Sequence, residues 1–234
     1  LPIFENYALV APWEKILATN QEIPFDELKN LECIGAIDYA QITDFCGVGL
    51  LFKHKGKRYW LSHTFVCDKA LKIESRPIKA PIQEWADAGM VTIVRNIITA
   101  DHVAQWFLEM GKKYHISNIL ADEYRISVLE EKFTEVGLPL NKVRSGPITH
   151  AKVAPLIETM FAEETIVFGD SPPMRWMTNN TCVVLDGKGN TTYQKIEPRT
   201  RKTDGFFALI HALSKDHELQ DTQNNFMSFD VYTY

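Results

Sequence analysis

The order of strand-like and helix-like stretches is the feature that most constrains the fold of this chain. An apolar run ending at Asp38 comes first. Two β-rich runs within 46–66 then surround a Lys-Gly-Lys turn, which predicts a hairpin. From residue 81 onward, stretches with helical apolar spacing alternate with short apolar strands. Three strands followed by alternating helices and strands predict an α/β fold, a mixed sheet with helices on both faces.

The boundaries of the later elements follow from apolar periodicity and from glycine and proline punctuation. We expect helices at 81–90, 99–114, 127–137, 147–164, 171–180 and from 204 onward. We expect strands at 91–95, up to Asp122 and at 165–169, and a second hairpin at 181–196.

The length of 234 residues suits one large domain with attachments. We expect residues 1–30 to be a lead-in, 31–216 the domain and 217–234 a loosely attached tail. The first residue is Leu1, which suggests a piece of a longer chain. The four cysteines show no metal-ligand spacing, so they are expected to be buried free thiols. No apolar run approaches the length needed to cross a bilayer, so no membrane association is expected.

Two aspartates each end an apolar, strand-like run: Asp38 ends "IGAID" and Asp122 ends "NILAD". Side chains at the carboxyl ends of strands face the crevice in which α/β proteins bind ligands. If the two strands are parallel neighbours, the carboxylates lie on the order of 5 Å apart. Such a pair repels unless one group is protonated or a cation lies between them.

Asp204 opens an apolar helix and would add a third carboxylate. Oxygen ligands without a His or Cys cluster favour Mg²⁺ or Mn²⁺ over zinc, and two such ions serve in-line phosphoryl displacement. Asp44 is a possible fourth ligand. The alternative is structural: each aspartate taken singly is a turn or cap residue, and Thr203 is a good N-cap for the last helix.

The net charge of −5 argues against a nucleic-acid partner, but the basic residues are clustered. The runs at 53–58 and 195–202 are either solvated hairpin tips or phosphate contacts that hold a nucleic-acid backbone across the carboxylates. Arg125 and Lys202 are the best single candidates because each is near a predicted ligand. The full set of candidate DNA contacts is Lys53, Lys55, Lys57, Arg58, Arg125, Lys195, Arg201 and Lys202.

Three blocks carry a family resemblance: "GAIDYAQITDFCGVGLL", "ILADEYRISVLEEKFTEVGLPL" and the stretch from "MRWMTNN" to "TDGFFALIHAL". Together they resemble the C-terminal nuclease domain of the large terminase subunit of tailed bacteriophages, in particular terminases that package DNA into HK97-type capsids. The likeness covers about residues 32–215. Its last block is the most specific, because an Asn doublet, a short acidic strand and a basic-x-Asp-Gly before a helix rarely coincide.

The resemblance implies a ribonuclease H-like fold and metal-dependent cutting of double-stranded, concatemeric DNA with Mg²⁺ or Mn²⁺, by a two-ion mechanism. Position by position, it assigns the catalytic and metal-binding acids to Asp38, Asp122 and Asp204, with Asp44 as a further candidate. It also implies an ATPase motor, the small terminase subunit and the portal as partners, and the cytoplasm of the infected bacterial host as the location. The chain has no G-x-x-x-x-G-K-[ST] motif, so the ATPase is expected upstream of Leu1.

Two other functions remain open from the sequence. One is another ribonuclease H-like nuclease, of the resolvase or integrase type, which would prefer structured junctions or transposon ends. The other is a non-catalytic DNA-binding or docking module of the packaging motor, which would bind no divalent ions specifically. The acidic total charge predicts that the isolated domain binds DNA weakly and that salt weakens binding further.

Overall fold

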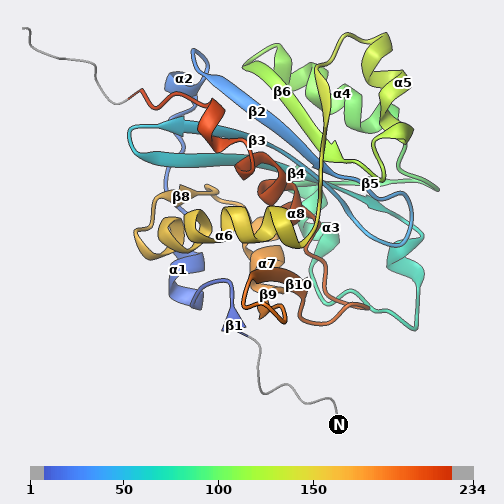
Figure 1. The fold of residues 1–234 in the computed structure, drawn as a ribbon. Helices are drawn as coiled ribbons and strands as arrows, with labels where there is room; N and C mark the ends of the chain where they lie inside the picture. Colours follow the sequence, from blue (N-terminus) through green and yellow to red (C-terminus); the bar gives the residue numbers. More distant parts are fainter. Residues whose placement is uncertain (1–7, 223–234) are drawn as a thin grey trace, which may run out of the picture.

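The computed structural model describes residues 8–222, and residues 1–7 and 223–234 lie outside the described part. A central sheet runs through the molecule with helices on both of its faces, and a smaller sheet lies at its lower edge (Figure 1). This is the mixed α/β architecture that the order of sequence patterns predicts.

Seven strands form the central sheet, in the order β5-β4-β3-β2-β6-β7, with β8 pairing with β4 beside β5. β3 and β4 form the predicted antiparallel hairpin. β2 is antiparallel to β3, and β6 lies parallel to β2. The strands are β2 (Glu32–Asp38), β3 (Cys46–His54), β4 (Lys57–Cys67), β5 (Val91–Val94), β6 (His115–Asp122), β7 (Leu140–Val143) and β8 (Ile166–Val167).

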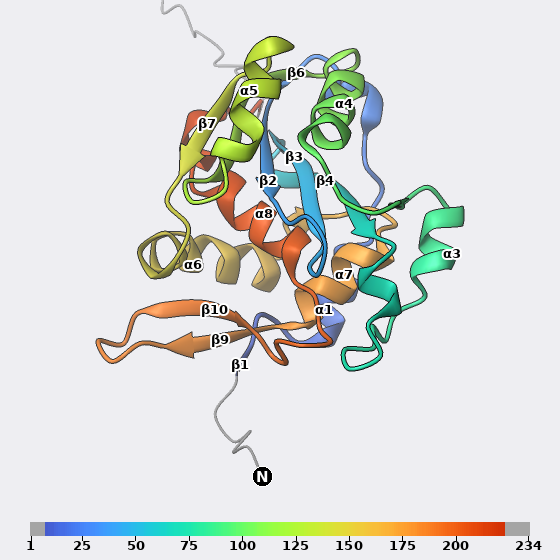
Figure 2. The same ribbon diagram turned by 90° about the vertical axis from the view of Figure 1, so that its right-hand side faces the viewer.

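Two groups of helices enclose the sheet (Figure 2). One face packs against α4 (Ala100–Gly111) and α5 (Ser127–Glu135), and the other against α6 (Pro147–Ala162), α7 (Pro172–Asn179) and α8 (Asp204–Leu213). Side chains alternate between the faces along each strand. In β2, Ile34 and Ala36 therefore belong to the core beneath α8, whereas Cys33 and Ile37 belong to the core beneath α4 and α5.

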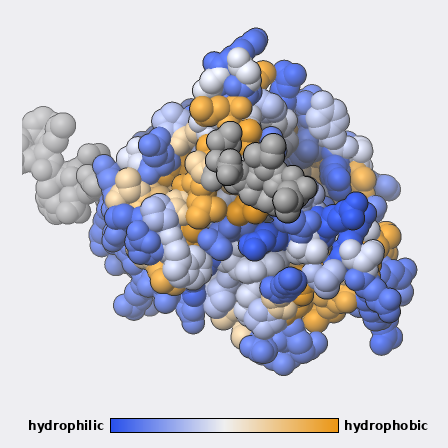
Figure 3. Space-filling view, turned by 90° about the horizontal axis from the view of Figure 1, so that it is seen from below, coloured by the Kyte–Doolittle hydropathy of each residue, from blue (hydrophilic) through white to orange (hydrophobic). Residues whose placement is uncertain are grey.

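A second sheet of three strands joins β1 (Ala8–Leu9), β9 (Thr181–Leu185) and β10 (Thr191–Lys195). The predicted hairpin of β9 and β10 is present, but it extends this separate sheet and not the central one. Leu9 and Leu185 are exposed on it. The lower face of the molecule shows hydrophobic patches among mostly hydrophilic residues (Figure 3). β10 ends at Lys195, and this places the Lys195 side chain near Asp204 at the start of α8.

Residues expected to form the lead-in and the tail also contribute to the core. Ile16 in α1 (Trp13–Leu17) and Leu28 in α2 (Phe25–Leu28) are fully buried. Leu219, after the 3₁₀ turn Asp216–Glu218, is 4% exposed and packs beneath α8. The remaining elements are a 3₁₀ turn (Ala70–Lys72) and α3 (Ile82–Asp87). Residues 1–7 and 223–234 of the expected lead-in and tail lie outside the described residues.

All four cysteines are buried and free, as predicted. Among residues 8–222, no helix has both the length and the apolar character that crossing a membrane requires.

Candidate functional site

Asp38 and Asp122 are the last residues of two neighbouring parallel strands. From Ile34 onward, β2 pairs residue by residue with β6 up to the position before each aspartate, so both aspartates lie at the same edge of the sheet. Each is two positions beyond a residue of the core beneath α8, Ala36 in β2 and Leu120 in β6. Because side chains alternate along a strand, both carboxylates belong to the face that α8 covers.

Gly47 lets the start of α8 lie beside these strand ends. It is the partner of Asp38 on β3. A Cβ atom at this position would lie 2.5 Å from the backbone oxygen of Asp204, closer than heavy atoms can pack. Only glycine therefore allows the first turn of α8 to rest on β3. This close approach brings the third predicted carboxylate to the same end of the sheet.

Asp204 does not have the contacts of an ordinary capping residue. Thr203 holds the N-cap position, but its side chain makes no capping hydrogen bond. Asp204 is only 3% exposed, and within the described residues its Oδ2 atom is buried without a hydrogen-bond partner. Leaving a buried polar atom unpaired costs free energy, and native proteins keep few such atoms. Asp204 is therefore a candidate functional residue.

Two carboxyl groups of the cluster have strongly raised pKa values. Burial, with smaller contributions from the charges of Asp44 and Asp122, raises the pKa of Asp38 to about 7. Burial, together with the charges of Asp38 and Asp44, likewise raises the pKa of Asp204 to about 7. Lys195 opposes both increases. Perturbed carboxyl groups at a sheet edge are a common sign of a catalytic or binding site.

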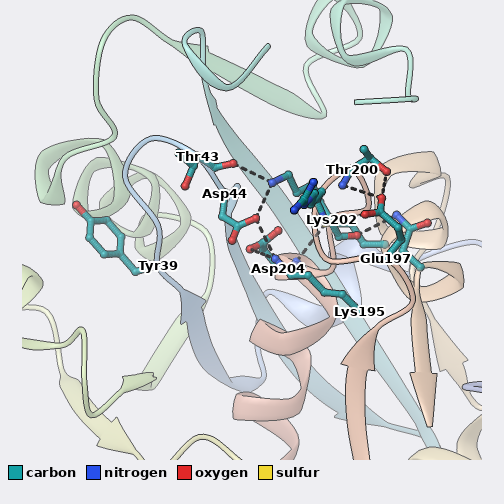
Figure 4. A network of polar contacts seen from close by, with 12 residues as sticks. Tyr39, Thr43, Asp44, Lys195, Glu197, Thr200, Lys202 and Asp204 are labelled. Atoms are coloured by element: carbon teal, nitrogen blue, oxygen red, sulfur yellow. Dashed lines mark hydrogen bonds and ion pairs between the residues drawn. The ribbon is translucent and has the colours of Figure 1, made fainter. Parts of the chain in front are cut away.

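Two lysines lie among the carboxylates, and Asp44, Lys195, Lys202 and Asp204 point toward one another (Figure 4). The Lys195 ammonium is 2.9 Å from Oδ1 of Asp44 and 4.0 Å from Oδ1 of Asp204. The Lys202 ammonium is 2.6 Å from Oδ1 of Asp44 and donates to the Thr43 carbonyl. Burial alone would raise the pKa of Asp44, but the two ammonium groups outweigh it and hold that pKa below its usual value. Asp44, the possible fourth ligand, is thus ion-paired with two lysines.

Within residues 8–222, no three His, Cys, Asp or Glu side chains stand together in an arrangement that could hold a metal ion. The three predicted acids, Asp38, Asp122 and Asp204, offer only oxygen atoms, which are the ligands that hard cations prefer. One of these atoms, Oδ2 of Asp204, is buried without a partner in the described part of the chain.

The candidate DNA contacts near this edge differ in exposure. Arg125 is exposed, bonds the Tyr39 carbonyl through Nη1 and lowers the pKa of Asp38 by its charge. Arg201 is also exposed, whereas Lys195 is half-buried. Lys202 is 4% exposed and directs its ammonium inward, so the prediction that it contacts a phosphate is not supported.

The basic run at 53–58 lies at the opposite end of the sheet. β3 begins beside Asp38 and runs antiparallel to β2, so the turn between β3 and β4 is at the far ends of these strands. Contrary to expectation, the run does not lie across the carboxylates. Its side chains pair with other residues: Lys53 and Arg58 with Asp216, Lys55 with Glu27, and Lys57 with Gln21.

Asn180 and Gly47 are structural supports of the site, and of the two the sequence singled out only Asn180, as part of the Asn doublet. The Asn180 amide donates to the Lys202 carbonyl at 3.0 Å and accepts from Arg201 at 3.1 Å. It thus holds the segment that leads into Asp204. The Asn doublet at 179–180 was the available signal for Asn180, and the Gly-x-Gly in β3 was the signal for Gly47.

Fold and site together define the class of protein. The order of the strands, the parallel pair β2–β6 and the helices on both faces make a ribonuclease H-like fold, as predicted. The chain belongs to the family of terminase large subunit endonuclease domains, because the model of that family matches residues 13–219. Compared by sequence with individually curated proteins, the chain matches none of them.

Solved structures agree with this family. The chain is similar to the large terminase of bacteriophage HK97, with a TM-score of 0.79 at 15% identity over 89% of this chain and 44% of that one. It therefore spans less than half of the HK97 protein. It is also similar to the large terminase nuclease of thermophilic phage G20c, with a TM-score of 0.53 at 8% identity over 80% of this chain and 83% of that one. Structures of the G20c nuclease with bound magnesium and with bound cobalt give TM-scores of 0.51 and 0.52.

Proposed function

We propose that this domain is a divalent-metal-dependent endonuclease that cuts double-stranded, concatemeric phage DNA during genome packaging. The observation that carries the proposal is Asp204: within the described residues it is a buried carboxylate with a raised pKa and an unpaired oxygen, close enough to the strand-end Asp38 for their charges to interact. Family membership supports the same reaction class.

Asp38, Asp122 and Asp204 would hold the ions, Mg²⁺ or Mn²⁺, with Asp44 able to join them if Lys195 and Lys202 release it. When bound, a pair of such ions activates a water for in-line attack on the phosphodiester and stabilises the leaving oxygen. Bound magnesium and cobalt in the G20c nuclease support the use of divalent ions. The burial of Asp204 supports the assignment, because a cation would relieve both its desolvation and its repulsion by Asp38.

The basic groups near this edge would hold the DNA. Arg125 and Arg201 are exposed and would each contact a backbone phosphate. Lys195 lies among the carboxylates, close to Asp204. When divalent ions neutralise Asp204, the Lys195 ammonium would be free to contact the scissile phosphate itself. Lys202 would act from the interior, by fixing Asp44 and Thr43.

The wider setting follows from the family and from the length of its full members. Because the chain spans 44% of the HK97 large terminase, we propose that an ATPase motor accompanies the domain in the same polypeptide. The small terminase subunit and the portal would be its partners, in the cytoplasm of the infected bacterium.

Plasmid cutting in Mn²⁺ tests the proposal. Asp38→Asn and Asp204→Asn should each reduce the cutting rate by more than about 100-fold, because each removes a negative ligand. Asp87→Asn, an exposed aspartate on α3, is the matched control and should cut at the wild-type rate. The proposal would be wrong if either site variant cut as fast as the control. A wild-type protein that neither cuts DNA nor binds Mn²⁺ by calorimetry would instead be a docking module.

A further inference from the structure

A cavity of about 330 Å³ lies beside the carboxylate cluster and has no assigned role. It is lined by Lys79, Trp176, Glu197, Thr200 and Arg201. Glu197 and Thr200 are seen next to Lys202 and Asp204 in Figure 4. The lining comes from three separate parts of the chain: the loop before α3, helix α7, and the segment between β10 and α8.

Phe45 is a buried residue that lies between Trp176 of the cavity and Lys202 of the carboxylate site. It directly follows Asp44, and its ring centroid is 6.4 Å from that of Trp176. On the carboxylate side, the Lys202 ammonium lies 5.9 Å from the same ring. Trp176 of the cavity and the lysine that pairs with Asp44 therefore flank the same buried ring.

The two cations of the cavity, Lys79 and Arg201, are carried by segments that pack or hydrogen-bond to the rest of the fold. Ile78 and Ala80 pack, like Trp176, against the buried cluster that contains Trp85, and Lys79 between them is exposed. Arg201 is exposed as well, and its Nη1 donates to Asn180. Both positive groups are therefore carried by backbone that is anchored to the core.

The one acidic group in the lining has a structural task. The Glu197 carboxylate accepts hydrogen bonds from the backbone N–H groups of Arg199 and Thr200 and from the Thr200 hydroxyl. These bonds lower its pKa and close the turn that precedes Arg201. With Lys79 and Arg201 opposed only by Glu197, the lining carries a net positive charge.

We propose that this cavity binds a backbone phosphate of the DNA strand being cut, next to the scissile phosphate, with Lys79 and Arg201 contacting the phosphate and Trp176 contacting its deoxyribose. Cations position a phosphate without reading sequence, and the apolar indole suits the sugar. This inference rests on the proposed function. It adds the loop at 73–81 to the DNA-binding surface and extends that surface from the carboxylates toward α3 and α7.

Binding of a fluorescein-labelled 30-base-pair duplex, measured by anisotropy at several salt concentrations in EDTA, tests the inference. The Lys79→Gln variant should weaken binding and reduce the slope of log K against log[salt] by about 1, the value for one lost phosphate contact. Lys113→Gln, at an exposed lysine two residues after the end of α4, is the matched control and should leave the slope unchanged. Trp176→Phe should weaken binding without changing the slope, because it removes contact area and no charge.

The failures of the two proposals are distinguishable. A wild-type protein that neither cuts plasmid nor binds the duplex would refute the proposed function. A wild-type protein that does both, with Lys79→Gln indistinguishable from Lys113→Gln, would refute only the phosphate site. Melting temperatures equal to that of the wild type would show that the exposed substitutions leave the fold intact.

Discussion

Replacing Asp204 by asparagine should change how the stability of the metal-free protein depends on pH. Asp204 is 3% exposed, and burial with the charges of Asp38 and Asp44 raises its pKa from 3.8 to about 7. Each pH unit of difference is worth ~1.4 kcal/mol, so the ionised form is disfavoured in the folded state by about 4 kcal/mol.

The sign follows from proton linkage. The folded protein keeps the Asp204 proton at pH values where the unfolded chain has lost it, so stability falls as pH rises through this window. The contribution of Asp204 is fully present below its unfolded pKa of 3.8 and is lost once pH passes its folded pKa of about 7. The free energy of unfolding of the wild-type protein should therefore drop by up to about 4 kcal/mol between these values because of this group.

Urea unfolding in EDTA, followed by circular dichroism between pH 4 and 8, measures the effect. The Asp204→Asn variant should show a flatter curve over this range, because asparagine does not titrate. Comparing slopes cancels the pH-independent cost of burying the new amide. The Asp87→Asn control should follow the wild type. Equal slopes for wild type and Asp204→Asn would refute the account of a buried, destabilised carboxylate.

Further predictions concern packing and the far end of the sheet. Gly47→Ala should destabilise the fold by about 2 kcal/mol and reduce plasmid cutting, because the new Cβ would lie 2.5 Å from the backbone of Asp204. The control Gly187→Ala should do neither, because a Cβ at that position meets nothing within 4 Å. Urea unfolding and a cutting assay check both variants. Arg58→Ala should lower the free energy of unfolding by about 2 kcal/mol, because it breaks the bidentate pair with Asp216. It should leave the salt dependence of DNA binding unchanged, and a shallower salt slope would contradict the placement of Arg58 away from the DNA.

Strong periodic patterns allowed much of the fold to be predicted from the sequence. The apolar runs that end at Asp38 and Asp122 are long, and each is one of two neighbouring parallel strands. β7 was not predicted because the run Leu140–Val143 is short and its two middle residues are exposed. The separate sheet of β1, β9 and β10 was also missed, since two residues of β1 leave no periodic signal.

The site was less predictable because its charge pairs join residues far apart in the chain. Nothing near Arg58 in the sequence indicates that Asp216 will pair with it, and Lys202 looks like any surface lysine between Arg201 and Thr203. The direction of the strands did carry information about the basic hairpin. An antiparallel β3 that starts beside Asp38 must place its turn at the other end of the sheet.

The central claim is that Asp38, Asp122 and Asp204 together bind divalent ions, and crystals grown in Mn²⁺ test it most directly. Anomalous scattering should reveal manganese between Asp38 and Asp122 and beside Asp204, with Lys195 displaced from the latter. Crystals grown at saturating Mn²⁺ that show no anomalous peak within coordination distance of these three carboxylates would contradict the account.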